Sequence, residues 1–189
     1  MKKIISTLSF ALLCLAAASC GNNAGRNDSK EAAEDMNDSM LEGTHMEDNA
    51  DFAVWAADAG MMEVQLGQLA QTNAASSQVK DFAQQMVDDH SKANDELKSY
   101  AQSRSITLPE ALSNDRQQRY NELSAKTGAD FDKEYVDQMV KDHKAVVDKF
   151  EDQSRETNDS ELRAWLEGKL PALRHHLEMA QTLQDGLKK

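Results

Sequence analysis

Apolar residues recur every three or four positions along most of the chain after residue 50, which is the spacing of one face of an α-helix. Four long stretches have this spacing, and each predicts an amphipathic helix. The first two stretches contain Phe52, Trp55, Ala56, Ala59, Met62, Leu66, Leu69 and Ala70, and then Val79, Phe82, Ala83, Met86, Ala93, Leu97 and Tyr100. The last two contain Phe131, Tyr135, Met139, Val146, Val147 and Phe150, and then Leu162, Trp165, Leu166, Leu170, Leu173, Leu177, Ala180 and Leu183.

Local signals predict where some of these helices begin or are disturbed. Ser76 or Ser77 is a suitable N-cap for the second helix, because a serine hydroxyl accepts a hydrogen bond from a free backbone N–H. Asn158, followed three residues later by Glu161, resembles a capping box in front of the fourth helix. Pro171 lies inside that fourth helix and is expected to kink or break it.

The lengths of the connections predict how the four helices are arranged. The links after the first and third helices are short, whereas the link between the second and third runs over about residues 104–128. Residues 104–108 interrupt the helical pattern, and Pro109 is expected to open a short helix over residues 109–125. One long connection in the middle is typical of ferritin-like folds. We therefore predict an all-α fold, a ferritin-like four-helix bundle over residues 51–189 with a long middle connection carrying a short extra helix.

The first twenty residues have the pattern of a bacterial export signal. Lys2 and Lys3 are followed by an apolar run from residue 4 to 18, which is shorter than the ~20 apolar residues of a membrane span. The sequence Ala17-Ala18-Ser19-Cys20 resembles a lipobox, with Ala17 where leucine is usual. We predict a lipoprotein signal peptide over residues 1–19 and lipidation of Cys20, which would anchor the protein to the outer membrane or in the periplasm of the cell envelope. The alternative is an ordinary secretory signal cleaved nearby.

The charge distribution limits the partners. Removing the signal lowers Lys+Arg from 21 to 19 against 33 Asp+Glu, so the mature net charge is about −14. Such a chain is a poor ligand for nucleic acid and a better one for cations. Residues 21–50 contain eight acidic and two basic side chains and no aromatic residue. We therefore expect residues 20–50 to form a disordered acidic tether, because they have little apolar surface to bury.

Each apolar face contains one polar residue near the middle of its helix: Glu63, His90, His143 and His176. His90 and His143 end the near-repeats QMVDDH and QMVKDH, which lie 53 residues apart. Counted from the short links at ~1.5 Å per residue, the four positions have similar depths. We therefore expect them to meet in one layer of the core.

Two interpretations of this layer remain open. Three imidazoles and one carboxylate are a suitable ligand set for a transition metal such as copper, zinc or iron. The same side chains could instead satisfy one another by hydrogen bonds, with the hydroxyl of Tyr100 or Tyr135 as a further partner. Unsatisfied, each buried polar group would cost about 1–3 kcal/mol, so the four side chains must pair with one another, with water or with an ion.

Three further residues are candidates next to this layer. Asp89 and Asp142 each precede a histidine, and one helical step turns the side chain by about 100° away from the inward direction. They are predicted to support a histidine of a neighbouring helix or to be surface charges. His175 is an alternate for His176, because Pro171 makes the phase of the fourth helix uncertain.

Four segments together carry a resemblance to a known family. They are DFAVWAADAGMME (51–63), VKDFAQQMVDDH (79–90), FDKEYVDQMVKDH (131–143) and LPALRHHL (170–177). The chain resembles the bacterial domain-of-unknown-function family 4142, exported proteins often labelled as outer-membrane proteins within the ferritin-like group. The resemblance covers about residues 50–186 and implies a ferritin-like bundle outside the cytoplasm, but no activity. Val87 and Val140 stand where the Glu-x-x-His motif of di-iron sites requires glutamate, so di-iron chemistry is not expected.

These observations predict a cell-envelope lipoprotein with a helical binding module, for which a metal ion held by Glu63, His90, His143 and His176 is the candidate ligand. The alternative is a structural or protein-interaction domain whose polar core layer is closed by hydrogen bonds. No catalytic residue is predicted, and a metal-dependent oxidase or hydrolase ranks behind both. Neither a cofactor nor a protein partner is identified by the sequence.

Overall fold

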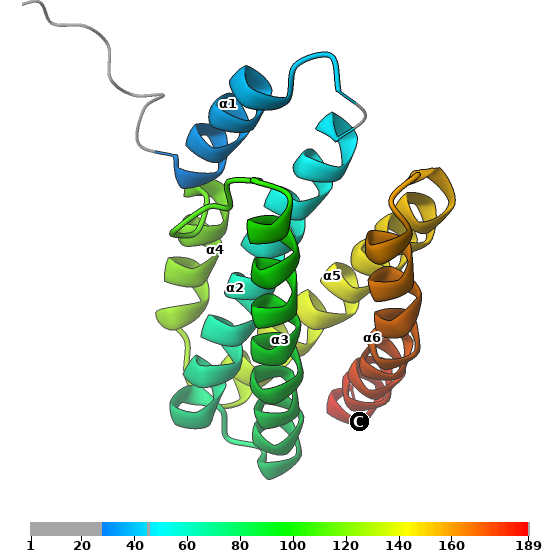
Figure 1. Ribbon diagram of the computed structural model, residues 1–189. Helices are drawn as coiled ribbons and strands as arrows, with labels where there is room; N and C mark the ends of the chain where they lie inside the picture. Colours follow the sequence, from blue (N-terminus) through cyan, green and yellow to red (C-terminus); the bar gives the residue numbers. More distant parts are fainter. Residues whose placement is uncertain (1–27, 45, 189) are drawn as a thin grey trace, which may run out of the picture.

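The structure is a computed structural model that describes residues 28–44 and 46–188. Its helices are α1 (Ser29–Leu41), α2 (Glu47–Asn73), α3 (Ser77–Ser103), α4 (Asn114–Ser124), α5 (Gly128–Glu156) and α6 (Ser160–Leu187) (Figure 1). The described part of the chain is therefore all-α, as predicted, and contains no β-strand. The signal peptide predicted over residues 1–19, and Cys20, lie outside the described residues.

Two helical hairpins make up most of the molecule. α2 and α3 form one hairpin, α5 and α6 form the other, and the long connection that carries α4 joins them (Figure 1). α2 lies against α5, and α3 lies against α6. Each long helix thus contacts its hairpin partner and one helix of the other hairpin, so four helices surround a common interior.

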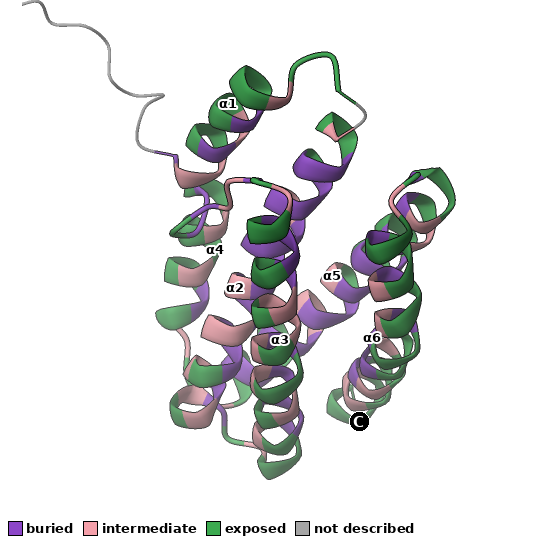
Figure 2. Ribbon diagram, in the orientation of Figure 1, coloured by how far each residue is buried: buried purple, intermediate pink, exposed green. Residues whose placement is uncertain are grey.

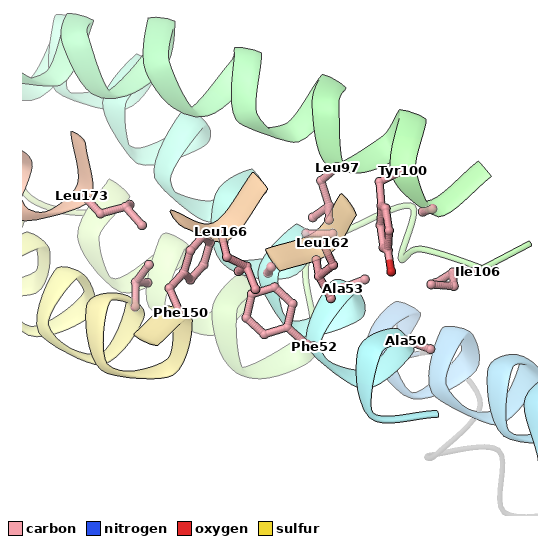
Figure 3. Close-up of a cluster of buried hydrophobic side chains, with 14 of the residues drawn as sticks. Ala50, Phe52, Ala53, Leu97, Tyr100, Ile106, Phe150, Leu162, Leu166 and Leu173 are labelled. Carbon is pink, nitrogen blue, oxygen red and sulfur yellow. The ribbon is translucent and has the colours of Figure 1, made fainter. Parts of the chain in front are cut away.

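The interior contains two clusters of buried apolar side chains, and the helix faces that point inward are buried (Figure 2). The first cluster includes Phe52, Leu97, Phe150 and Leu166 (Figure 3). The second includes residues such as Phe82 and Met139, nearer the α2–α3 turn. Burial of these side chains supplies the main driving force for packing the hairpins together.

The two helices of the first hairpin approach each other closely at Gly67. A Cβ atom at this position would lie 2.7 Å from Val87 Cγ2 and 2.8 Å from the Ala83 carbonyl oxygen. A larger residue would therefore push the helices apart, which explains why glycine stands in the middle of α2 despite its low helix propensity.

The disordered tether predicted over residues 20–50 is wrong for its second half, because residues 29–41 form helix α1 and α2 already begins at Glu47. Polar bonds hold α1 in place. The buried Asn37 side chain accepts from the Thr107 N–H at 2.7 Å and donates to the Thr107 carbonyl at 2.9 Å. Ser29 Oγ accepts from two backbone N–H groups near Pro109. Composition alone does not predict α1, because hydrogen bonds to a distant backbone segment help to hold this helix although it has little apolar surface.

The short helix in the middle connection begins at Asn114 instead of Pro109. Carboxylates from distant parts of the chain accept hydrogen bonds from the backbone N–H groups at its start. The buried carboxylate of Asp58 accepts from the N–H and hydroxyl of Ser113, and Asp28 accepts from the Asn114 N–H. These long-range partners fix the preceding segment outside a helix.

The predicted helix signals had mixed outcomes. Ser76 is the N-cap of α3, with its Oγ 3.5 Å from the Val79 N–H, as expected. The capping box at Asn158 is wrong: Asp159 is the N-cap of α6 and accepts from two N–H groups of the first turn. Pro171 does not end the helix, since α6 continues through it to Leu187.

Candidate metal centre

The structure brings the four predicted polar residues together between the two apolar clusters. Glu63 comes from α2, His90 from α3, His143 from α5 and His176 from α6, and all four are buried. The three imidazole rings form a triangle with centroids 5.4–5.6 Å apart. The layer expected from the counting argument is therefore present.

One ring nitrogen from each histidine faces a common point. These three nitrogen atoms all lie within 4.8 Å of one another. All three nitrogens are buried; His143 Nε2 and His176 Nδ1 have no hydrogen-bond partner among the described residues, and His90 Nε2 faces the Glu63 carboxylate at 2.7 Å. A group of buried imidazole nitrogens without partners is unusual, because native proteins satisfy nearly all buried polar groups.

Hydrogen bonds orient two of the imidazoles. His143 Nδ1 lies 3.0 Å from the Met139 carbonyl oxygen, which can only accept, so Nδ1 carries the proton. His176 Nε2 lies 2.8 Å from Asp89 Oδ2 and donates to this carboxylate. In each neutral ring the other nitrogen then has a free lone pair that points into the centre. Metal-binding histidines are typically held in this way.

Glu63 provides the one carboxylate of the centre, and its side chain is 1% exposed. Its Oε2 atom lies 2.7 Å from His90 Nε2, and Oε1 lies 3.7 Å from His143 Nδ1. The 2.7 Å contact pairs Glu63 with His90, and no other described residue forms a hydrogen bond with either carboxylate oxygen. Tyr135 adds a buried hydroxyl, also without a partner, whose pKa is raised by burial and by the charge of Glu63.

Electrostatics favours an ion pair between Glu63 and His90 at neutral pH when no metal is bound. Burial raises the pKa of Glu63, but the charges of His90 and His143 lower it more, to about 2. Burial lowers the pKa of His90, and the Glu63 carboxylate raises it more, above the usual 6.5. Burial lowers the pKa of His176 to about 4, although its bond to Asp89 opposes this. The centre therefore holds an anionic carboxylate and at least one neutral imidazole.

The remaining sequence candidates have clear positions. Asp89 lies on the surface of α3 and supports His176 across the helix interface, which is one of its two predicted roles. Asp142 accepts a hydrogen bond from Gln138 on its own helix at 2.7 Å and contacts no histidine of the centre; burial raises its pKa. His175 is exposed, so His176 is the inward residue of the pair.

A cleft reaches the centre from the solvent side. Glu63, His90 and His176 line its inner end, and Trp55, Phe150 and Trp165 line its walls. The sequence does not reveal this cleft, because both tryptophans follow the helical pattern of apolar positions, like ordinary core residues. The helix pattern shows which face a side chain is on, but it does not show whether facing side chains fill the space between two helices.

None of the described helices is both long and apolar enough to cross a membrane. Comparison with curated proteins and with solved structures found no match to the chain. Residues 31–183 match the family described as Domain of unknown function (DUF4142). The matched range includes the four residues of the centre and begins within α1, in agreement with α1 being part of the folded unit. The chain therefore belongs to the DUF4142 family.

Proposed function

We propose that this protein is a metal-binding module of the bacterial cell envelope, with a ferritin-like four-helix bundle that holds one transition-metal ion. Glu63, His90, His143 and His176 would be its ligands, one from each long helix. The proposal rests on three buried imidazoles whose inward ring nitrogens lie within 4.8 Å of one another, two of which, His143 Nε2 and His176 Nδ1, have no hydrogen-bond partner among the described residues.

The ligand set agrees with the chemistry of copper, zinc or iron, which bind imidazole nitrogen and carboxylate oxygen. In a tetrahedral site with bonds of about 2.1 Å, two nitrogens lie about 3.4 Å apart. The nitrogens here lie within 4.8 Å of one another, so small rotations of the side chains would complete the site. His90 must lose its proton to bind, and affinity should therefore increase with pH.

A core layer closed by hydrogen bonds is the weaker interpretation. In the metal-free form the Glu63–His90 pair balances two charges. His143 Nε2, His176 Nδ1 and Tyr135 Oη still have no partner in the described part of the chain, and each would cost about 1–3 kcal/mol if it stayed unsatisfied. An ion at the common point satisfies the two imidazole nitrogens at once, which hydrogen bonds within the layer do not.

The proposed location follows from the N-terminal pattern. A lipid on Cys20 would attach the protein to the envelope membrane, with residues 21–27 between the lipid and the first described residue, Asp28. The bound ion would then be held outside the cytoplasm. The excess of acidic residues supports a module that attracts cations and does not bind nucleic acid.

Adjacent histidines on α6 allow a sharp test. Residues 21–189 are produced without an affinity tag, loaded with Cu²⁺, Zn²⁺ or Fe²⁺, dialysed, and analysed for metal by mass spectrometry. We expect about one ion per chain, lost in His176→Ala and retained in the matched control His175→Ala, because only His176 faces the centre.

Two outcomes would refute the proposal. One is a wild-type protein that retains none of the three ions after dialysis. The other is equal loss of metal in the two variants, which would place binding on the surface of α6. Circular dichroism of each variant verifies that the helices are intact.

A further inference from the structure

The cleft opens to solvent between α3 and α6, and polar contacts between these two helices border its mouth at both ends. At one end Asp89 accepts a hydrogen bond from His176. At the other end Glu96 accepts one from Trp165 Nε1 at 3.0 Å and forms an ion pair with Lys169. The two bridges are seven residues apart on α3, which is about 10 Å along the helix axis.

Two alanines occupy the positions between these bridges. Ala93 lies on α3 between residues 89 and 96, and Ala172 lies on α6 between residues 169 and 176; both line the cleft. Their short side chains leave the space between the bridges open. The opening is therefore a consequence of two small residues facing each other across the helix interface.

The size and the walls of the cleft limit what can enter. Its volume is about 60 Å³. A cavity of about 150 Å³ holds benzene, and one water molecule occupies about 30 Å³ of the liquid, so this cleft admits a molecule of only a few atoms. The wall side chains include Trp55, Leu97, Val146 and Leu173, which offer no charge to an entering ligand.

The charges at the cleft disfavour an anion. The carboxylate of Glu63 lies at its inner end and that of Asp89 at its mouth, and the ammonium group of Lys169 is paired with Glu96. An uncharged molecule meets no such repulsion and is favoured by the apolar walls.

We propose that this cleft is a port through which a small uncharged molecule with one donor atom reaches a fifth coordination position on the ion. The class includes diatomic ligands such as nitric oxide and dioxygen. The binding of the molecule to the ion rests on the proposed metal site, whereas the port itself can be tested on metal-free protein.

The port is tested with xenon, a small uncharged probe of apolar cavities. Methyl NMR spectra of metal-free protein are recorded under increasing xenon pressure. We expect saturable shifts at Leu97, Val146 and Leu173, which line the cleft, and none at Leu66 in the second apolar cluster. Ala172→Phe should abolish these shifts, and the control Ala145→Phe, at an exposed position of α5 outside the cleft, should preserve them. Ala93→Phe, which fills the mouth from α3 instead of α6, should abolish the shifts as well.

The binding of the small molecule to the ion is tested on Co²⁺-loaded protein, whose visible spectrum reports ligand binding. We expect nitric oxide to bind at least tenfold more tightly than azide, a small linear anion of three atoms. Ala172→Phe should weaken nitric oxide binding at least tenfold with an unchanged cobalt content, and Ala145→Phe should leave it unchanged.

The outcomes separate the two proposals. Bound cobalt without xenon shifts overturns the port and leaves the metal site standing. Xenon shifts without bound cobalt leave the port standing, while the metal site and the delivery of a ligand to it both fail. Azide binding as tight as nitric oxide, or no response of bound cobalt to nitric oxide, overturns the proposed class of ligand.

Discussion

At the residue scale, the centre is governed by the competition between burial and neighbouring charge. Burial alone would keep Glu63 protonated and the histidines neutral, because charged forms lose their hydration in the core. The contact between Glu63 and His90 overcomes the effect of burial and favours the charged form of both side chains. His176 has only the half-exposed Asp89 as a counter-charge and stays neutral. The pKa values of His90 and His176 are therefore shifted in opposite directions within one layer.

This difference predicts a pH dependence of the metal-free protein. The pKa of His176 is about 4 when folded and close to 6.5 when unfolded, so the unfolded chain binds more protons between these values. Stability from this residue is thus fully present above about pH 6.5 and is lost as the pH falls towards 4. When the pH falls from 7 to 4.5, the free energy of unfolding measured by urea denaturation should decrease by about 2–3 kcal/mol more in the wild type than in His176→Leu.

The control for this prediction is His175→Leu, which changes an exposed imidazole one position away and should keep the wild-type pH slope. A His176→Leu slope equal to the wild-type slope would mean that burial does not hold His176 in its neutral form.

At the element scale, α1 shows how a polar segment becomes part of a fold. It has few apolar side chains, and only Ala33 and Asn37 of its residues are buried. It lies against α2, and two of its side chains, Ser29 and Asn37, bond to the backbone of the middle connection. The same bonds satisfy N–H and C=O groups of a segment that is neither helix nor strand.

We predict that Asn37→Ala lowers the free energy of unfolding by about 1–3 kcal/mol, because the N–H and the carbonyl of Thr107 both lose their partner. Asp35→Ala, at an exposed position on the same helix, should change it by no more than about 0.5 kcal/mol. Chemical denaturation measures both. Equal effects of the two substitutions would show that α1 is not docked through Asn37.

At the scale of the whole molecule, the centre connects the two hairpins. Glu63 and His90 belong to the first hairpin, and His143 and His176 belong to the second. An ion bound by all four would link elements that are otherwise joined by the middle connection and by packing. It binds only when both hairpins are in place, so its binding free energy becomes folding free energy.

Metal should therefore raise the melting temperature, and at a free ion concentration of 1,000 times Kd the stabilisation is about 4 kcal/mol. We predict that His143→Leu loses this response completely. Without metal this variant should be at least as stable as the wild type, because leucine replaces an imidazole whose Nε2 atom is buried without a partner.

Thermal denaturation with added metal and with a chelator measures this response. A metal-dependent shift that persists in His143→Leu would show that the ion does not bind at the layer between the two apolar clusters. A large loss of metal-free stability would show that the imidazole is satisfied in the core.

The sequence by itself determined the four long helices, the position of the long connection and the four inward polar residues, because helical periodicity and depth are counted along a single chain. It left His175 and His176 as alternatives, since the effect of Pro171 on the helix phase depends on packing. The tertiary structure alone decided what arises between distant segments. Only in the folded protein does Asn37 bind α1 to the backbone of the middle connection, and only there do three imidazole nitrogens face one point. The two alanines likewise lie opposite each other at the mouth of the cleft only after folding. Such features depend on which residues meet across helices, and no local pattern in the sequence encodes that.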